Sequence, residues 1–431
     1  MEKQKKDTKY IWIYSALLIV LVSIIFVPIL FKKEVYMFLD IGADTYSGNW
    51  PTLEQAVRWW REDIKSLWSF QIGLGANVFM STDTYFDPFI VILFPFKNPA
   101  DGITLMMLLK YGVLGITAYK LYGKMGLRKM PLIIAALCHT FSGFMVGWGQ
   151  HYTFSTCFVL YTVLLYSIVR YRENGKWGLV TLATVLLCCF SLYFAYMSLL
   201  FAGFLVVVHY IVYDMHGGIK RAYRKFVSKY LPLACAVFCG VLLSFPVFLQ
   251  QIDILTNTSR ITGESGINLE LNSLKAIFTY VERCFSNVLT GISESVSGKN
   301  FYESPILYVG VIAIYGIIAF VVKSIKEKKK SISLFIIGMV CIVLFPNFIH
   351  PIFNGLSDNT TRWLFTIVPV LCWISAKGIE LILRNDRSIV RITCILGESI
   401  IVIFSIIYCL KVLPLFQNEG KIQVIAISVI V

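Results

Sequence analysis

The stretch YIWIYSALLIVLVSIIFVPILF, residues 10–31, decides the fold class of this chain. It contains no charged side chain, and about 20 apolar residues suffice for a helix to cross the hydrocarbon of a bilayer. It has no small-residue cleavage site of the kind that ends a secretory signal peptide. We therefore predict that this stretch is a membrane span that stays in the protein.

The composition extends this prediction to the whole chain. Of 431 residues, 57% are hydrophobic and 15% charged, and the mean hydropathy is +0.72. Soluble domains carry about a quarter charged residues. All eleven cysteines except Cys284 lie in apolar runs, which excludes a disulfide framework and gives no zinc-type spacing. These features predict an all-α polytopic membrane protein.

Further apolar runs predict the other spans. We expect helices near residues 10–31, 102–122, 130–148, 153–169, 177–191, 192–213, 230–250, 304–322, 331–349, 361–379 and 390–411. The run from Trp177 to Tyr213 is too long for one span, and we divide it at Ser191-Leu192-Tyr193. A twelfth span begins near Ile422, and the chain ends inside it. The prediction is a single transmembrane domain over residues 1–431 with 11 to 12 helices.

The distribution of charge predicts the orientation of these helices. With the N-terminus in the cytoplasm, the inner segments hold 25 of the 39 Lys and Arg residues, and the outer segments hold 13. Cytoplasmic loops of membrane proteins are enriched in Lys and Arg. The net charge of +14 is therefore a sign of topology and of contact with the lipid bilayer, and it does not predict nucleic-acid binding.

Two outer loops are much longer than the hairpins elsewhere. In the first loop, residues 32–101, the stretch PTLEQAVRWWREDIKSLW has Leu53, Ala56, Val57, Trp60, Ile64, Leu67 and Trp68 at helical spacing. This pattern predicts an amphipathic helix from Pro51 to Trp68 that lies flat in the outer interface. The second loop, residues 251–302, repeats the pattern from Leu271 to Val288, where a simple packing helix is an equal alternative.

The first loop opens with two carboxylates next to the end of the first span. In FLDIGADTYSGNW, residues 38–50, Asp40 and Asp44 lie one helical turn apart. Ionisable side chains near hydrocarbon are costly, which makes them candidates for a functional site. The structural alternatives are a helix cap for either residue and, for Asp44, a salt bridge with Lys32 or Lys33.

Several motifs together resemble a known family. A loop with carboxylates after the first span, followed by interfacial helices, looks like the C-type membrane glycosyltransferases (GT-C). More specifically, the chain resembles the bacterial YfhO family over almost its whole length. The matching segments are Ala43-Asp44 with Tyr46, WSFQIGLGANVF at 68–79, YFDPFIVILFPF at 85–96, FSGFMVGWGQHYTF at 141–154, SLYFAYM at 191–197, YESPILYVG at 302–310 and FNGLSDNTTRW at 353–363.

The chain departs from the family pattern at two motifs and in length. The family usually has Gln-Tyr where this chain has Thr45-Tyr46, and Tyr-Tyr-Leu-Ser-Pro where it has Tyr85-Phe86-Asp87-Pro88. Family members are commonly longer, so we expect the chain to be a short relative or a fragment.

The resemblance implies a GT-C-like bundle that moves a sugar from a polyprenyl-phosphate carrier to a cell-envelope glycopolymer such as a teichoic acid. Such a transfer needs a base for the acceptor hydroxyl, and it needs cations for the leaving phosphate. We interpret Asp44 as the base and Asp40 as its orienting partner, or as a ligand if a divalent metal is used. Arg362 is the candidate for the phosphate because a guanidinium group binds phosphate in bidentate fashion. The structural alternative is that Arg362 only snorkels, so that its charge reaches water from the outer end of a span.

The remaining candidates are weaker, because each has a structural alternative. Trp363, Tyr193 and Tyr196 could stack on the sugar or flank the lipid, but aromatic side chains are common at membrane interfaces. Asp83 and Asp87 could instead form a turn, and His151 could be a hydrogen-bonded structural histidine. The full set of further substrate-binding candidates is Trp363, Asp87, Asp83, Tyr193, Tyr196, His151 and Asn354.

Two other functions compete with the enzyme. A lipid-carrier flippase would need ionisable residues along a path through its spans. The only charged residues that lie away from the ends of the predicted spans are Lys110 and Glu398. A non-catalytic scaffold for envelope assembly is the third alternative. Because the polar candidates gather at outer ends, the sequence favours an enzyme at the extracytoplasmic face. It leaves the sugar, the acceptor and metal dependence open.

Overall fold

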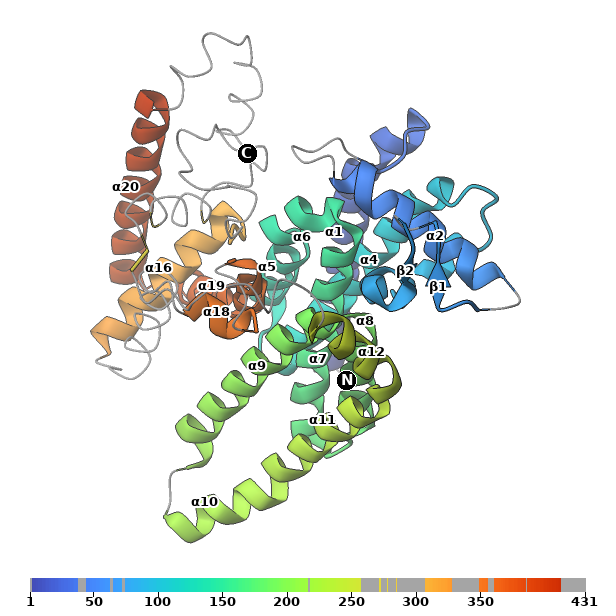
Figure 1. The fold of residues 1–431 in the computed structure, drawn as a ribbon. Coiled ribbons are helices and arrows are strands. Elements are labelled where there is room, and N and C mark those ends of the chain that lie inside the picture. Colours follow the sequence, from blue (N-terminus) through green and yellow to red (C-terminus); the bar gives the residue numbers. More distant parts are fainter. Residues whose placement is uncertain are drawn as a thin grey trace. The chain divides into compact units, whose positions relative to one another are not determined.

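A computed structural model describes residues 2–37, 44–62, 65–71, 74–215, 218–256, 307–327, 349–355, 360–384 and 386–411, with residues 271, 272, 277 and 284. The described chain is almost entirely helical (Figure 1). It divides into two compact units. The first unit contains residues 1–126, 148–266 and 353–358, and the second contains 127–147, 267–352 and 359–431. The predicted fold class, an all-α polytopic membrane protein, is confirmed.

The first unit begins with a long helix and a folded loop. Helix α1 covers Glu2–Phe31 and is followed by a π-helical turn, η1 (Thr45–Asn49), which runs directly into α2 (Trp50–Arg61). A short antiparallel hairpin follows, with β1 (Trp68–Ser69) paired to β2 (Ala76–Asn77). The loop ends with η2 (Val78–Ser81), α3 (Thr82–Tyr85) and η3 (Ile90–Leu93). The first loop is therefore a folded element of this unit.

The long helices of the first unit pack around α7. Helix α4 (Ala100–Lys124) and helix α8 (Gly178–Phe190) both pack against α7 (Tyr152–Asn174), which η4 (Trp148–Gln150) precedes. Helix α9 (Leu192–His209) continues through η5 (Tyr210–Asp214), and α10 (Ile219–Lys225) continues through η6 (Phe226–Tyr230) into α11 (Leu231–Leu243), as Figure 1 shows. Helix α12 (Phe245–Thr256) ends this series.

The second unit is organised by a close helix pair. It contains α5 (Lys129–Thr140), α6 (Gly143–Gly147), α16 (Val311–Lys326), η8 (Arg362–Ile367), α19 (Val368–Leu383) and α20 (Arg387–Lys411). All residues of α18 (Ile349–Phe353) except Phe353 also belong to this unit. Helix α19 packs against α16 and α5, and α16 also packs against α20. A Cβ atom at Gly378 would collide with the Gly316 backbone, so only glycine permits this crossing of α16 and α19.

Most predicted spans have a matching helix. Seven helices in the described chain are long and apolar enough to cross a membrane: Lys9–Phe31, Ala100–Lys124, Lys129–Gly147, Tyr152–Asn174, Leu192–Asp214, Ile219–Leu243 and Arg362–Leu383. The predicted break at Ser191 is confirmed, because α8 ends at Phe190 and α9 begins at Leu192. The spans predicted at 331–349 and from Ile422 lie almost wholly outside the described residues.

Three predicted boundaries are wrong, and two of them have a local cause. The helix expected from 304 begins at Val311, because Gly310 has φ +95° and interrupts the helical path. The helix expected over 230–250 begins earlier, at Ile219, and ends at Leu243, just before Ser244 and Pro246. The amphipathic helix expected over Pro51–Trp68 ends at Arg61, and Trp68 starts β1.

The apolar stripe of α2 is confirmed where the helix forms. Leu53, Ala56 and Val57 are buried against the rest of the first unit, while Trp60 is partly exposed. The helix predicted between Leu271 and Val288 lies almost entirely outside the described residues.

Candidate functional site

Asp44 lies at the start of the turn that leads into α2. It directly precedes η1, its side chain is exposed, and it makes no hydrogen bond that caps the helix. The capping alternative is therefore not supported for Asp44. Lys32, one of the two residues considered as a salt-bridge partner of Asp44, forms an ion pair with Glu34 at 3.9 Å. Asp40 lies outside the described residues.

The turn that carries Asp44 is attached to the start of α7 on both sides. Before it in the sequence, Tyr36 accepts a 2.9 Å hydrogen bond at its carbonyl oxygen from the Tyr152 hydroxyl. After it, the Asn49 side-chain nitrogen lies 2.8 Å from Nδ1 of His151. His151 thus has a positioning contact with the first loop.

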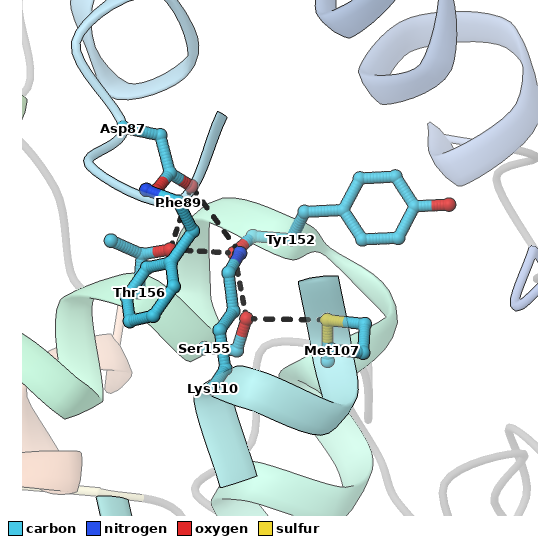
Figure 2. Close-up of polar contacts among 7 residues, drawn as sticks. All are labelled: Asp87, Phe89, Met107, Lys110, Tyr152, Ser155 and Thr156. Carbon is cyan, nitrogen blue, oxygen red and sulfur yellow. Dashed lines mark hydrogen bonds and ion pairs between the residues drawn. The ribbon is translucent and has the colours of Figure 1, made fainter. Parts of the chain in front are cut away.

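A third segment of the first loop reaches the same end of α7 through Asp87. This carboxylate is buried, and it accepts a 2.7 Å hydrogen bond from the Thr156 hydroxyl and a 2.8 Å bond from the Phe89 backbone N–H. Lys110 of α4 lies 3.3 Å from the same carboxylate. Figure 2 shows the Lys110 ammonium between the loop and α7, with the Tyr152 ring pointing away from the cluster.

Lys110 is fully buried, and its charge has several partners. Besides the Asp87 carboxylate, Nζ donates a 2.9 Å hydrogen bond to the Tyr152 carbonyl oxygen and lies over the Phe89 ring. Lys110, Tyr152 and Thr156 were not among the candidates from sequence, although an ionisable residue inside a span was a usable signal for Lys110. Partners for the charges of Asp87 and Lys110 explain why both can be buried.

Asp83 lies on α3, four residues before Asp87, and its carboxyl group is poorly solvated. Burial, and to a smaller extent the nearby charge of Asp87, raise the pKa of Asp83 to about 6, against hydrogen bonds from the Asp83 and Thr84 backbone that lower it. A carboxyl group that titrates near neutral pH can exchange protons under physiological conditions. The structure thus gives the two acids of this motif different environments.

Two other candidates, Tyr193 and Asn354, come together in the first unit. The Tyr193 hydroxyl donates a 3.2 Å hydrogen bond to the side-chain oxygen of Asn354, which is buried. Tyr193 follows the break at Ser191, so the break aims the first turn of α9 toward Asn354. Tyr196, one turn further along α9, is 40% exposed.

The candidates of the second unit lie at the start of η8. Trp363 is buried, and its indole N–H donates a 3.1 Å hydrogen bond to Nδ1 of His350. Arg362 is partly exposed at the first position of η8. Within the described residues, no group of three or more His, Cys, Asp or Glu side chains is arranged to hold a metal ion.

These helices and the folded first loop define a polytopic helical membrane protein. The model of the family described as bacterial membrane protein YfhO matches residues 43–431, which is most of the chain. The chain belongs to the YfhO family of bacterial membrane proteins. No curated protein and no solved structure matches it.

Proposed function

We propose that this protein is a membrane glycosyltransferase that moves a sugar from a polyprenyl-phosphate carrier to a cell-envelope acceptor, such as a teichoic acid, at the extracytoplasmic face. The observation that carries the proposal is the YfhO family match, which begins at residue 43 beside Asp44 and includes nearly all of the first loop. The contacts of Tyr36 and Asn49 with α7, which hold the turn of Asp44 in place, support it.

The proposed reaction forms a bond between the acceptor oxygen and the anomeric carbon. The bond between that carbon and the phosphate oxygen breaks, and the carrier leaves as polyprenyl phosphate. Asp44 takes the acceptor's hydroxyl proton, with Asp40 as its partner, since a base must lie within hydrogen-bond reach of that proton. Arg362 binds the phosphate, whose charge grows as the bond breaks. Tyr193, Tyr196 and Trp363 are the candidate contacts of sugar and lipid.

The flippase alternative is less well supported. A transporter path through the membrane is lined with ionisable groups that face water or substrate. Lys110, one of the two charged residues that lie away from the ends of the predicted spans, is buried against Asp87 and the Tyr152 carbonyl. Its contacts are those of a residue that anchors a loop.

The test compares turnover and donor binding in the purified full chain. Polyprenyl-phosphate sugars are supplied in detergent micelles, and released polyprenyl phosphate is measured. Asp44→Asn keeps the shape of the side chain but removes the base, so we expect turnover to fall about 10² to 10⁴-fold while donor binding persists. Arg362→Ala should weaken both donor binding and turnover.

Glu62→Gln is the matched control, because Glu62 is an exposed carboxylate of the same loop, and its turnover should equal that of the wild type. An unchanged rate in Asp44→Asn would remove Asp44 from the mechanism. Movement of the lipid-linked sugar across the membrane without release of polyprenyl phosphate would show that the protein is a flippase and not a glycosyltransferase.

A further inference from the structure

A basic hollow lies beside the first loop, apart from the residues assigned to sugar transfer. It has a volume of about 390 Å³ and lies between α2 and the segment from Lys97 to Asp101 that leads into α4. Three cations line it, Arg58, Arg61 and Lys97, together with the carboxylates of Glu54 and Asp101. All of them belong to the first unit.

The α-helical period explains why α2 contributes three charged residues to one hollow. Glu54, Arg58 and Arg61 are spaced four and three residues apart, so they lie on one face of the helix. Leu53, Ala56 and Val57, which lie on another face, are buried in the first unit. The burial of that apolar face turns the charged face toward the hollow.

The two guanidinium groups are already held in place. Arg61 donates through Nη2 to the carbonyl oxygens of Leu93, Phe94 and Phe96, the Phe94 bond being 3.0 Å long. Arg58 donates through Nη2 to Glu54 at 2.6 Å. Within the described residues each group makes these bonds through Nη2 alone, which leaves Nη1 and Nε as donors for a ligand. Little side-chain entropy would then be lost when an anion binds.

The balance of charge in the hollow favours an anion. Glu54 is neutralised by Arg58, so Arg61 and Lys97 face only one further carboxylate, that of Asp101. Lys97 is exposed and has no hydrogen bond or ion pair to the described part of the chain. A phosphate group has several strong acceptor oxygens and can bind more than one cation at once, and Arg is well suited to phosphate geometry.

We propose that this hollow binds a phosphate group, as a monoester or a diester. The group comes from a lipid headgroup or from a soluble phosphate ester, and the same cations would hold either. The proposal goes beyond sugar transfer and does not depend on it, because its residues are distinct from Asp44 and Arg362.

The test measures binding directly by ³¹P NMR. The purified full chain is kept in a maltoside detergent, which contains no phosphate, and glycerophosphoglycerol is titrated in as a soluble diester. Phosphatidylglycerol added to the micelles is the lipid arm. We expect saturable line broadening of at least one probe, competition by inorganic phosphate, and no competition by acetate at the same concentration. Binding of the lipid alone would assign the headgroup as the source.

Some variants should weaken phosphate binding and one should strengthen it, so a general loss of folding cannot produce the expected pattern. Combining Arg58→Gln with Lys97→Gln should weaken binding about tenfold, because two charge-assisted contacts are lost. Asp101→Asn should tighten binding, because it removes a repulsive charge from the hollow. Lys33→Gln removes a cation from the same loop outside the hollow and should leave affinity unchanged. Arg61 is kept, because its bonds to three carbonyls support the loop.

Several results would overturn the proposal. They are the absence of binding by both probes, equal affinity in the double variant and the wild type, competition by acetate as strong as that by phosphate, and weaker binding in Asp101→Asn. Sugar transfer can fail in every assay while phosphate still binds here, so the two proposals fail separately.

Discussion

Among the ion pairs formed by the described residues, the pair between Asp87 and Lys110 is the most enclosed. Removing one partner of a buried pair leaves the other charge without compensation, which typically costs about 3 to 5 kcal/mol. Lys110 has no exposed surface, and Asp87 is 3% exposed. We therefore expect the pair to matter more for the attachment of the loop than the exposed pairs of the chain do.

Substitution of either partner tests this expectation. Asp87→Ala should lower the free energy of unfolding by about 3 to 5 kcal/mol, because the Lys110 charge stays buried. The double variant Asp87→Ala with Lys110→Met should lose less than the sum of the two single variants. Thermal unfolding of the detergent-solubilised protein, followed by tryptophan fluorescence, measures both. Strict additivity would show that the two side chains do not interact.

Asp83 should make stability depend on pH. Its pKa is raised from 3.8 to about 6 in the folded protein, so the folded state holds a proton that the unfolded chain releases. The stabilisation from that proton is complete below about pH 4 and is lost as the pH rises to about 6, at no more than about 1.4 kcal/mol per pH unit. Above pH 6 the ionised, poorly solvated carboxylate destabilises the fold.

The variant Asp83→Asn removes this dependence. Its melting temperature relative to the wild type should rise between pH 4 and pH 6 and then stay constant. Asp101→Asn, which changes an exposed carboxylate at the start of α4, is the control. If the difference in melting temperature between Asp83→Asn and the wild type were the same at pH 4 and at pH 7, burial would not be the cause of the raised pKa of Asp83.

The sequence pointed to candidate acids, but it could not identify their partners. Asp44 stood out because carboxylates are rare near apolar runs, and Asp87 because it departs from the family motif at Tyr85-Phe86-Asp87-Pro88. The partners of Asp87 are Lys110 and Thr156, which lie 23 and 69 residues away. Such pairs depend on how α4 and α7 pack, and hydrophobic periodicity carries no information about that packing.

At the scale of elements, hydrophobicity predicted the long helices better than their ends. The apolar stripe of Leu53, Ala56 and Val57 correctly predicted a helix, but the helix ends at Arg61, where the side chain bonds to the carbonyls of Leu93, Phe94 and Phe96. The Trp59 indole N–H then donates to the Ser66 carbonyl and stabilises the turn toward β1. Tertiary hydrogen bonds of this kind override a local pattern.

The crossing of α16 and α19 gives a prediction about one helix pair. Gly378→Ala should destabilise the second unit by at least about 2 kcal/mol, because the new methyl group would meet the backbone at Gly316 and the helices must move apart. Gly112→Ala in α4 is the matched control, because nothing lies within 4 Å of its Cβ position and Ala is the better helix former. Thermal unfolding distinguishes them, and equal melting temperatures would refute the close crossing.

At the scale of the whole molecule, the charge asymmetry predicts the orientation. A cysteine at Gln71 in the first loop should react with a membrane-impermeant maleimide added to intact cells, and a cysteine at Lys176 between α7 and α8 should not. Both side chains are exposed, so the protein itself shields neither position from the reagent, and only the membrane can cause a difference in labelling. Wild-type protein gives the background from native cysteines. Labelling at 176 and protection at 71 would invert the topology and place Asp44 in the cytoplasm.

The sequence predicted the class of the molecule more fully than its internal arrangement. Long uncharged runs are sufficient to indicate spans, because each must satisfy its own backbone hydrogen bonds in lipid. The division of the described chain into two units follows from contacts such as Tyr193 with Asn354, which join residues 161 positions apart. No local property of either residue indicates that pairing.

The attachment of the first loop to α7 has a consequence for biosynthesis. Tyr36, Asn49 and Asp87 leave the ribosome before their partners at His151, Tyr152 and Thr156, with helices α4, α5 and α6 in between. The loop therefore cannot complete its polar contacts until α7 has been made and inserted. During that interval Asp87 lacks the Thr156 hydroxyl and Lys110 lacks the Tyr152 carbonyl, so the attachment of the first loop is completed only after three further helices have been made.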